Sequence, residues 1–192
     1  EVQFNPGTPL LVQLSGLLPF RLTKAQERVI HEIFRDMTSP RPMNRLVQGD
    51  VGSGKTAVAL QAIVMACGSG YQAALMAPTE ILAEQHYRNL SGLLKVLGLQ
   101  TALVRGGEKA SVKNAQAEQL ASGDIHVAIG THALLQQDVT FKNLGLAVID
   151  EQHRFGVHQR LAMTAKGRAP HMLVMTATPI PRTLVLTAYG DM

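Results

Sequence analysis

The chain has 192 residues, 46% of them hydrophobic, which suits one folded domain with a sizeable core. It shows no signal-peptide pattern and no apolar run near the ~18 residues that a membrane span needs, so we expect no membrane partner and a cytoplasmic location. Cys67 is the single cysteine. An intrachain disulfide is therefore excluded, and a packed thiol is expected.

The net charge of +4 favours a polyanionic partner without requiring one. The imbalance is concentrated between Gln152 and Gly190, a window without an acidic residue. Its basic residues are Arg154, Arg160, Lys166, Arg168 and Arg182. A solvated face would look the same, because no aromatic residues alternate with these charges as base stacking requires.

The first 18 residues are rich in proline and glycine and show little periodicity, which is typical of a linker or edge segment arriving from an upstream domain. Because the chain starts at Glu1, we expect it to be a piece of a longer protein. Residues Thr23 to Met37 then place their apolar side chains on one helical face. Thr23 and Gln26 have the spacing of a capping box, which predicts a helix that begins there.

From residue 44 onward, short apolar strands alternate with helices. The expected strands are 45–48, 73–77, 101–104, 126–130, 146–149 and 172–175. The expected helices between them are 54–67, 79–97, 111–121 and 159–166. Continuously apolar strands are typical of a parallel sheet that is covered on both faces. The pattern predicts an α/β domain with an open, mostly parallel sheet, helices on both faces and a ligand beyond the carboxyl ends of the strands.

A phosphate-binding loop follows the first of these strands. Residues 49–56 have the spacing G-x-x-x-x-G-K-[ST] between a strand and a helix. Glycines let backbone N–H groups approach phosphate oxygens, and a helix N-terminus favours an anion. We expect Lys55 to reach the β- and γ-phosphates and the Thr56 hydroxyl to bind Mg²⁺. The predicted nucleotide-binding residues of the loop are Gly49, Asp50, Val51, Gly52, Ser53, Gly54, Lys55 and Thr56. The alternative is a glycine turn that matches by chance.

Two adjacent carboxylates, Asp150 and Glu151, end the apolar strand at 146–149. In enzymes with a phosphate loop, such a pair binds Mg²⁺ and polarises the attacking water. We therefore predict Asp150 as a metal ligand beside Thr56, and Lys55, Asp150 and Glu151 as catalytic. Two neighbouring acids in a surface turn are the alternative.

Several motifs together resemble superfamily 2 helicases over about residues 19–190. They are the phosphate loop at 49–56, Asp-Glu-Gln-His-Arg-Phe-Gly-Val at 150–157, Thr-Ala-Thr-Pro-Ile-Pro-Arg-Thr at 176–183, and the strand-end segments 78–86 and 130–135. The resemblance is to bacterial fork-remodelling DNA helicases. Transcription-coupled repair translocases are similar but have a second Glu where this chain has Gln152. RNA helicases of the superfamily are disfavoured by the Arg-Phe-Gly-Val that follows His153.

The resemblance implies roles for residues outside the loop. Phe20, Thr23 and Gln26 match the motif that recognises adenine, so Gln26 would read the base as well as cap a helix. Gln152, His153, Thr176 and Thr178 match positions that couple nucleotide state to nucleic-acid binding. If strand 172–175 lies between the strands at 45–48 and 146–149, as in RecA-like cores, Thr176 lies within reach of the two carboxylates. A helix cap before Pro179 would also explain Thr176 and Thr178.

The resemblance also implies contacts to DNA at strand ends that open helices or turns. The expected residues are Pro78, Thr79, Gly106, Gly107, Thr131 and His132. Helix N-termini with hydroxyl groups bind phosphates without reading bases. Ordinary turns with no ligand are the alternative at each place.

Residues 19–192 are thus expected to form the first RecA-like, P-loop NTPase domain of a helicase that uses ATP and Mg²⁺. The implied function is an ATP-driven motor that remodels branched or duplex DNA in recombination and repair. A second RecA-like domain and a wedge domain would lie outside this chain. The alternative from another class is a nucleotide switch or a small-molecule phosphotransferase, which the several helicase motifs disfavour.

Overall fold

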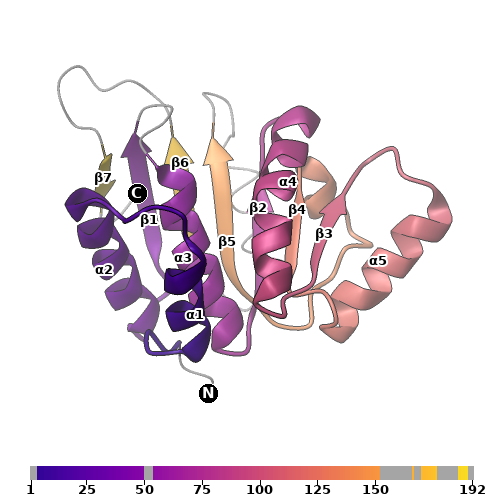
Figure 1. Cartoon of the computed structure of the whole chain (residues 1–192). Helices are drawn as coiled ribbons and strands as arrows, with labels where there is room; N and C mark the ends of the chain where they lie inside the picture. Colours follow the sequence, from indigo (N-terminus) through magenta and orange to yellow (C-terminus); the bar gives the residue numbers. More distant parts are fainter. Residues whose placement is uncertain (1–3, 50–53, 152–165, 167–169, 177–185, 190–192) are drawn as a thin grey trace.

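The computed structural model describes residues 4–49, 54–151, 166, 170–176 and 186–189 (Figure 1). The helices are α1 (Pro9–Leu17), α2 (Lys24–Thr38), α3 (Lys55–Gly68), α4 (Glu80–Val96), α5 (Ala110–Ser122) and the short 3₁₀ helix η1 (His132–Leu135). The strands are β1 (Asn44–Gly49), β2 (Gln72–Met76), β3 (Thr101–Val104), β4 (Val127–Gly130), β5 (Leu144–Glu151), β6 (His171–Thr176) and β7 (Leu186–Tyr189).

The strands form one sheet in the order β3-β4-β2-β5-β6-β1-β7. All pairs from β3 to β1 are parallel, and β7 adds an antiparallel edge strand beside β1. The prediction of an open, mostly parallel sheet is confirmed, and β6 lies between β1 and β5 as the RecA-like arrangement implies. Strand β7 was not predicted. It is a short edge strand whose backbone pairs with that of β1 from Gly49 to Leu46.

Successive residues of the central strands point to opposite faces of the sheet, and both faces are buried. One apolar cluster contains Val148 of β5 and Leu75 of β2 together with buried residues of α1, α2, α3 and α4. The other contains the alternate strand residues Ile149 and Met76 with side chains of α5 and η1. Helices therefore cover both faces, as predicted. Because both faces are covered, the central strands are apolar throughout.

The segment before residue 19, which we expected to be a linker or edge, contains helix α1 packed on α3. Pro9 stands in the first helical turn, where its missing N–H is not needed. Leu14 is 0% exposed and joins the core, whereas Val12 on the same helix is 73% exposed. This helix was missed because it is short and few of its apolar side chains reach the core.

Helix α2 begins as predicted. The Gln26 N–H donates to Thr23 Oγ1 at 3.1 Å, and the Thr23 N–H donates to Gln26 Oε1 at 2.8 Å, which completes the capping box. The helix is tied to β1 by Arg45, which is 7% exposed and pairs with Asp36 at 2.6 Å and with Glu32 at 3.4 Å. A buried arginine needs such partners because an unpaired buried charge is strongly unfavourable.

The remaining sequence predictions have mixed outcomes. Burial raises the pKa of the Cys67 thiol to about 12, in agreement with a packed, unreactive cysteine. The helix predicted at 159–166 lies outside the described residues except for Lys166. Within the described part of the chain, no helix is long and apolar enough to cross a membrane.

We predict that Leu14→Ala lowers the free energy of unfolding of this chain by about 2 to 5 kcal/mol, because it leaves a cavity between α1 and α3. Val12→Ala, on the exposed side of the same helix, is the control and should change it by less than about 0.5 kcal/mol. Urea denaturation of both variants measures the difference. Equal effects would show that α1 does not contribute to the core.

Candidate nucleotide and nucleic-acid site

The predicted site residues that the structure describes lie at or just after the carboxyl ends of the parallel strands, apart from those that begin or precede α2. Parallel strands end at the same edge of a sheet, which brings these residues together although they are distant in sequence. The strand order sorts them into two groups. Strands β1, β6 and β5 carry the predicted nucleotide residues, and strands β2, β4 and β3 carry the predicted DNA contacts (Figure 1).

The described ends of the phosphate loop have the geometry that the motif requires. Gly49 ends β1, and Gly54 precedes α3 in the left-handed region at φ +85°. Lys55 and Thr56 are the first two residues of α3. Residues 50–53 lie outside the described part of the chain. The α3 residues 57–66 are all buried, so packing fixes the direction in which the N-terminus of this helix points.

Gln26 contacts the loop directly. Its Nε2 donates to the Gly54 carbonyl at 3.3 Å, and a Cβ added to Gly54 would lie 1.8 Å from the same Nε2. One side chain thus caps α2 through its oxygen and contacts the phosphate loop through its nitrogen. Phe20, also predicted to contact adenine, is 51% exposed just before this helix. The segment that we predicted to read the base and the phosphate loop are therefore neighbours in space.

The two carboxylates end β5 as predicted. In the sheet register, Glu151 pairs with Thr176 of β6, and Thr176 pairs with Gln48 of β1, one residue before the loop glycine. Asp150 pairs with Met175 and keeps a partly buried side chain. The expectation that Thr176 lies within reach of the carboxylates agrees with this register. Gln152, His153 and Thr178 lie outside the described residues.

His86 of α4, the last residue of the segment 78–86 and one that we did not predict to be a site residue, contacts Asp150. The His86 Nε2 and Asp150 Oδ2 atoms are 2.8 Å apart. His86 shares the buried face of α4 with Ala83, Leu90 and Leu94. A histidine on an otherwise apolar helical face is a signal that the sequence contained, because a buried polar side chain requires a partner.

The predicted DNA contacts differ in accessibility. Thr79 is exposed and accepts the Leu82 N–H at 3.2 Å as the N-cap of α4. Thr131 is only 2% exposed, and its hydroxyl donates to Glu80 Oε1 at 3.4 Å, whereas the adjacent His132 is exposed. The hydroxyl of Thr131 thus joins η1 to α4 in this structure instead of facing outward. This contact could not be predicted from the sequence, because Glu80 and Thr131 follow different strands and meet only through the order of those strands in the sheet.

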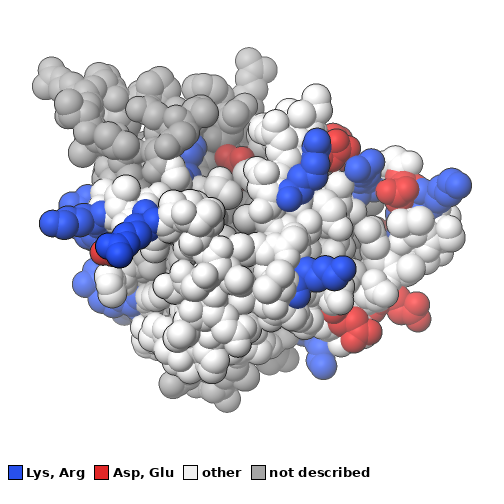
Figure 2. Space-filling model, viewed as in Figure 1, with Lys and Arg blue, Asp and Glu red and all other residues white. Residues whose placement is uncertain are grey.

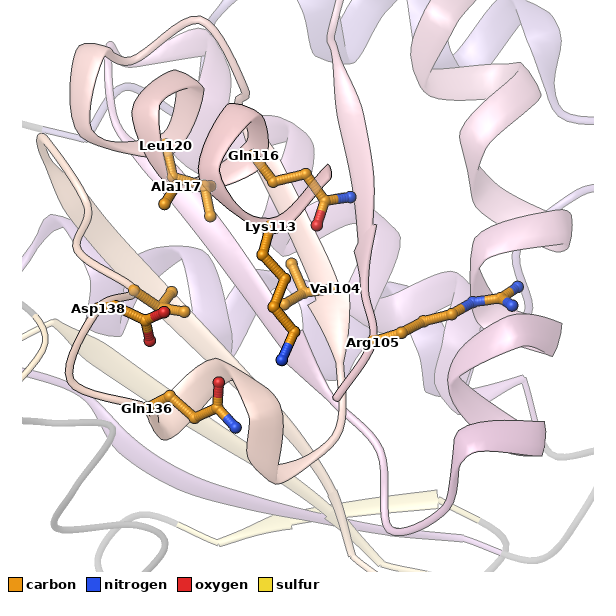
Figure 3. A pocket seen from close by; sticks show the side chains of 9 residues that line it. Val104, Arg105, Lys113, Gln116, Ala117, Leu120, Gln136 and Asp138 are labelled. Atoms are coloured by element: carbon orange, nitrogen blue, oxygen red, sulfur yellow. The ribbon is translucent and has the colours of Figure 1, made fainter. Parts of the chain in front are cut away.

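The Gly106–Gly107 turn follows β3. A Cβ added at either glycine would have no atom within 4 Å, and neither has a positive φ. Internal packing of the described residues therefore does not explain these glycines. Arg105 beside them extends away from the small pocket in Figure 3 and pairs with Glu84 of α4 at 3.1 Å. This arginine connects the β3 turn to α4.

Two cavities lined by described residues lie away from the predicted nucleotide site. The pocket of Figure 3, between β3, α5 and η1, has a volume of about 20 Å³, enough for a single water molecule. A second cavity of about 200 Å³ lies around the α2–β1 connection at the amino end of β1. The phosphate loop is at the opposite end of that strand.

The charge distribution of the described residues gives no extended basic surface on the face in Figure 2. Both signs alternate around α4 and α5, mainly basic side chains are visible over α2, and few charged side chains lie over α1 and α3. Of the basic residues that we singled out between 152 and 190, only Lys166 is described. Its Nζ donates to the carbonyl oxygens of Gln136 and Val139, and burial lowers its pKa. It therefore anchors the turn after η1.

The residues present fit a Mg²⁺–nucleotide. Strand β6 alone separates β1 from β5, so the loop strand and the carboxylate strand are about 10 Å apart, at ~4.8 Å per strand spacing. That interval suits phosphates on the loop side and a hydrated cation on the Asp150 side. Hard oxygen donors such as the Thr56 hydroxyl and the Asp150 carboxylate are those that Mg²⁺ prefers.

We predict that Gly54→Ala weakens nucleotide binding and lowers the free energy of unfolding by about 1 to 2 kcal/mol, because alanine is strained at this φ. Adding Gln26→Ala should relieve the steric contact and leave the backbone strain. The control is Gly92→Ala within α4, where the added methyl meets nothing within 4 Å and should stabilise the helix by about 0.5 to 1 kcal/mol. Denaturation curves of the three variants give the comparison. Equal responses at the two glycines would contradict the assignment.

Comparison with known proteins gives a consistent result. The DEAD/DEAH box helicase family matches residues 23–186. The ATP-dependent DNA helicase RecG of Synechocystis sp. is 58% identical over 98% of this chain and 23% of its own length. That of Escherichia coli (strain K12) is 54% identical over 94% of this chain and 27% of its own length.

The solved structure of RecG bound to a three-way DNA junction superposes with a TM-score of 0.82 at 48% identity, over 94% of this chain and 24% of that one. This likeness confirms the predicted RecA-like helicase fold. The chain spans about a quarter of the length of these relatives. Since the family match covers most of the chain and these relatives share about half of its residues, the chain belongs to the DEAD/DEAH box helicase family.

Proposed function

We propose that this chain is the ATP-binding motor domain of an ATP-dependent DNA helicase that remodels branched DNA in recombination and repair. The single observation that carries the proposal is the row Gln48–Thr176–Glu151 across β1, β6 and β5, which aligns the phosphate loop with the strand-end carboxylates. The names of the RecG relatives and the DNA junction bound in one of them support the choice of substrate. They also favour this function over a transcription-coupled repair translocase.

Each residue has a distinct proposed role. The backbone of the loop and Lys55 bind the β- and γ-phosphates, and the positive dipole end of α3 favours these anions. Thr56 and Asp150 hold Mg²⁺, which when bound neutralises charge on the phosphates. Glu151 orients the attacking water and accepts its proton. Phe20 and Gln26 contact the adenine, and the link from Gln26 to Gly54 lets base recognition and loop position depend on each other.

DNA binding is proposed at the second half of the same edge. Thr79 and His132 are exposed, the Gly106–Gly107 turn has open space beside it, and the partly buried Pro78 comes directly before Thr79. Thr131 supports this surface through Glu80 in the present structure. Gln152, His153, Thr176 and Thr178 would transmit the nucleotide state to the DNA.

The complete motor requires more than this chain. We propose that a second RecA-like domain supplies the arginine finger and the other wall of the ATP site, and that a wedge domain splits the branched DNA. This chain spans about a quarter of the length of its relatives, which are therefore long enough to contain both further domains. Their bacterial origin favours action in the bacterial cytoplasm.

A nucleotide switch or small-molecule phosphotransferase is the competing class. It predicts ATP turnover that DNA does not change, whereas a motor hydrolyses ATP faster on branched or duplex DNA than without it. Steady-state ATPase assays of the complete protein with branched DNA, duplex DNA and RNA distinguish these functions.

We expect Lys55→Ala to lower ATP turnover by about 10²-fold or more, because the γ-phosphate loses its cationic partner where charge develops. Glu151→Gln should bind ATP normally and lose about 10²- to 10⁴-fold in turnover, because an amide cannot accept the proton. The exposed Lys95→Ala on α4 is the control. Wild-type turnover in Lys55→Ala, or loss of ATP binding in Glu151→Gln, would refute the assigned roles.

For the DNA surface, Thr79→Val should weaken binding by about tenfold through loss of one hydrogen bond to a charged phosphate. The loss should be equal on junctions of different base sequence, because phosphate contacts carry no sequence information. Thr79→Ser keeps the hydroxyl and the cap of α4, and should bind like the wild type. Fluorescence anisotropy with labelled junctions measures all three proteins, and a loss confined to one sequence would argue against a phosphate contact.

A further inference from the structure

The hydrogen bond between His86 and Asp150 crosses the boundary between the two halves of the site. Helix α4 follows β2 in the chain, and β2 pairs with β5, which ends in the carboxylates. His86 on this helix comes within 2.8 Å of Asp150 Oδ2. The side chains are 11% and 16% exposed. The contact is therefore largely shielded from water, where a hydrogen bond is stronger than at the surface.

The chemistry of the pair fixes its direction. An ionised carboxylate only accepts hydrogen bonds, so the proton lies on His86 Nε2 and is donated to Oδ2. One oxygen of Asp150 is then held, and the rotation of the carboxylate is restricted. The second oxygen, Oδ1, is the one that a cation or its bound water can take. Carboxylates that bind metals are commonly held in this way by an outer hydrogen-bond donor.

A purely structural reason for histidine is weak at this position. The other residues of the buried face of α4 are Ala83, Leu90 and Leu94, all apolar. A leucine could pack there without the desolvation that a polar ring requires. Among the described residues, the ring of His86 finds its side-chain partner in Asp150, the residue to which we assign Mg²⁺.

We propose that His86 is a positioning residue, which holds the Asp150 carboxylate in place for the Mg²⁺ of a bound nucleotide. The inference rests on the proposed function, because it takes Asp150 to be the metal ligand. It assigns to α4 a role in the nucleotide site in addition to its proposed contact with DNA. His86 itself touches neither the nucleotide nor the reacting water.

The test is a Mg²⁺ titration of the complete protein at a fixed concentration of a fluorescent, non-hydrolysable ATP analogue. His86→Leu should raise the Mg²⁺ concentration for half-maximal binding by about 10- to 100-fold, and binding in EDTA should stay as in the wild type. His86→Gln places an amide N–H near the position of Nε2 and should stay within about threefold of the wild type. His86→Asn has a shorter side chain that cannot reach it, and should behave like His86→Leu. Gln85→Leu, on the exposed side of α4, is the control.

If His86→Leu fails to fold, the comparison of His86→Gln with His86→Asn still decides the test. Both side chains are polar amides and differ mainly in whether they are long enough to reach Asp150. An unchanged Mg²⁺ requirement in folded His86→Asn would overturn the inference and show that the hydrogen bond serves only the fold. Failure of the wild type to bind the analogue would instead refute the proposed function. An unchanged Mg²⁺ requirement in Asp150→Asn would refute both, because it would remove Asp150 from the metal site.

Discussion

The parallel register of β1, β6 and β5 is the constraint on which the proposed site depends. It places Gln48, Thr176 and Glu151 in one row, although more than a hundred residues separate the first from the other two. Side chains alternate with a period of two along a strand, so a slip of β5 by one residue would turn each of its side chains, including that of Asp150, to the other face of the sheet. The register is held because both faces of these strands are buried and every residue of the apolar run has a place in one core or the other.

Burial of α3 has a related consequence for the phosphate loop. The helix lies against the sheet on one side and against α1 and α2 on the other, and residues 57–66 are all buried. Its N-terminus therefore cannot turn away from the end of β1 without breaking the core. Gln26 adds a contact from α2 to Gly54, so three elements determine where the loop ends. A rigid scaffold around a glycine-rich loop keeps the N–H groups directed at a ligand before it binds.

The parts of this architecture that sequence reasoning found are those governed by local chemistry. Continuous apolar strands, the glycine spacing of the loop and the Thr23–Gln26 cap each follow from interactions within a few residues, and the observed elements lie close to the expected ranges. Helix α1 and strand β7 were missed because tertiary contacts stabilise them. Leu14 packs on a helix some fifty residues further along, and β7 pairs with β1 from the far end of the chain.

Side-chain partners across strand ends were the least predictable part of the candidate site. The sequence shows that Thr131 and Glu80 each follow a strand, but the hydroxyl of Thr131 turns inward to Glu80 because β4 and β2 are neighbours. His86 was similar: its place on an apolar helical face indicated that it needed a partner. The identity of that partner depends on the order β2-β5, which is a property of the whole sheet.

Thr79 is the N-cap of α4, and His86 on this helix lies seven residues and about 10 Å further along its axis. If Thr79 binds a DNA phosphate and His86 holds the metal ligand, a small shift of this rigid helix changes both contacts together. Linkage then requires reciprocity: the factor by which Mg²⁺–nucleotide changes DNA affinity equals the factor by which DNA changes nucleotide affinity. A motor needs such a coupling, since it must grip and release DNA in step with its nucleotide. In this fold the coupling would not need a long pathway, because one hydrogen bond of 2.8 Å joins the two halves of the site.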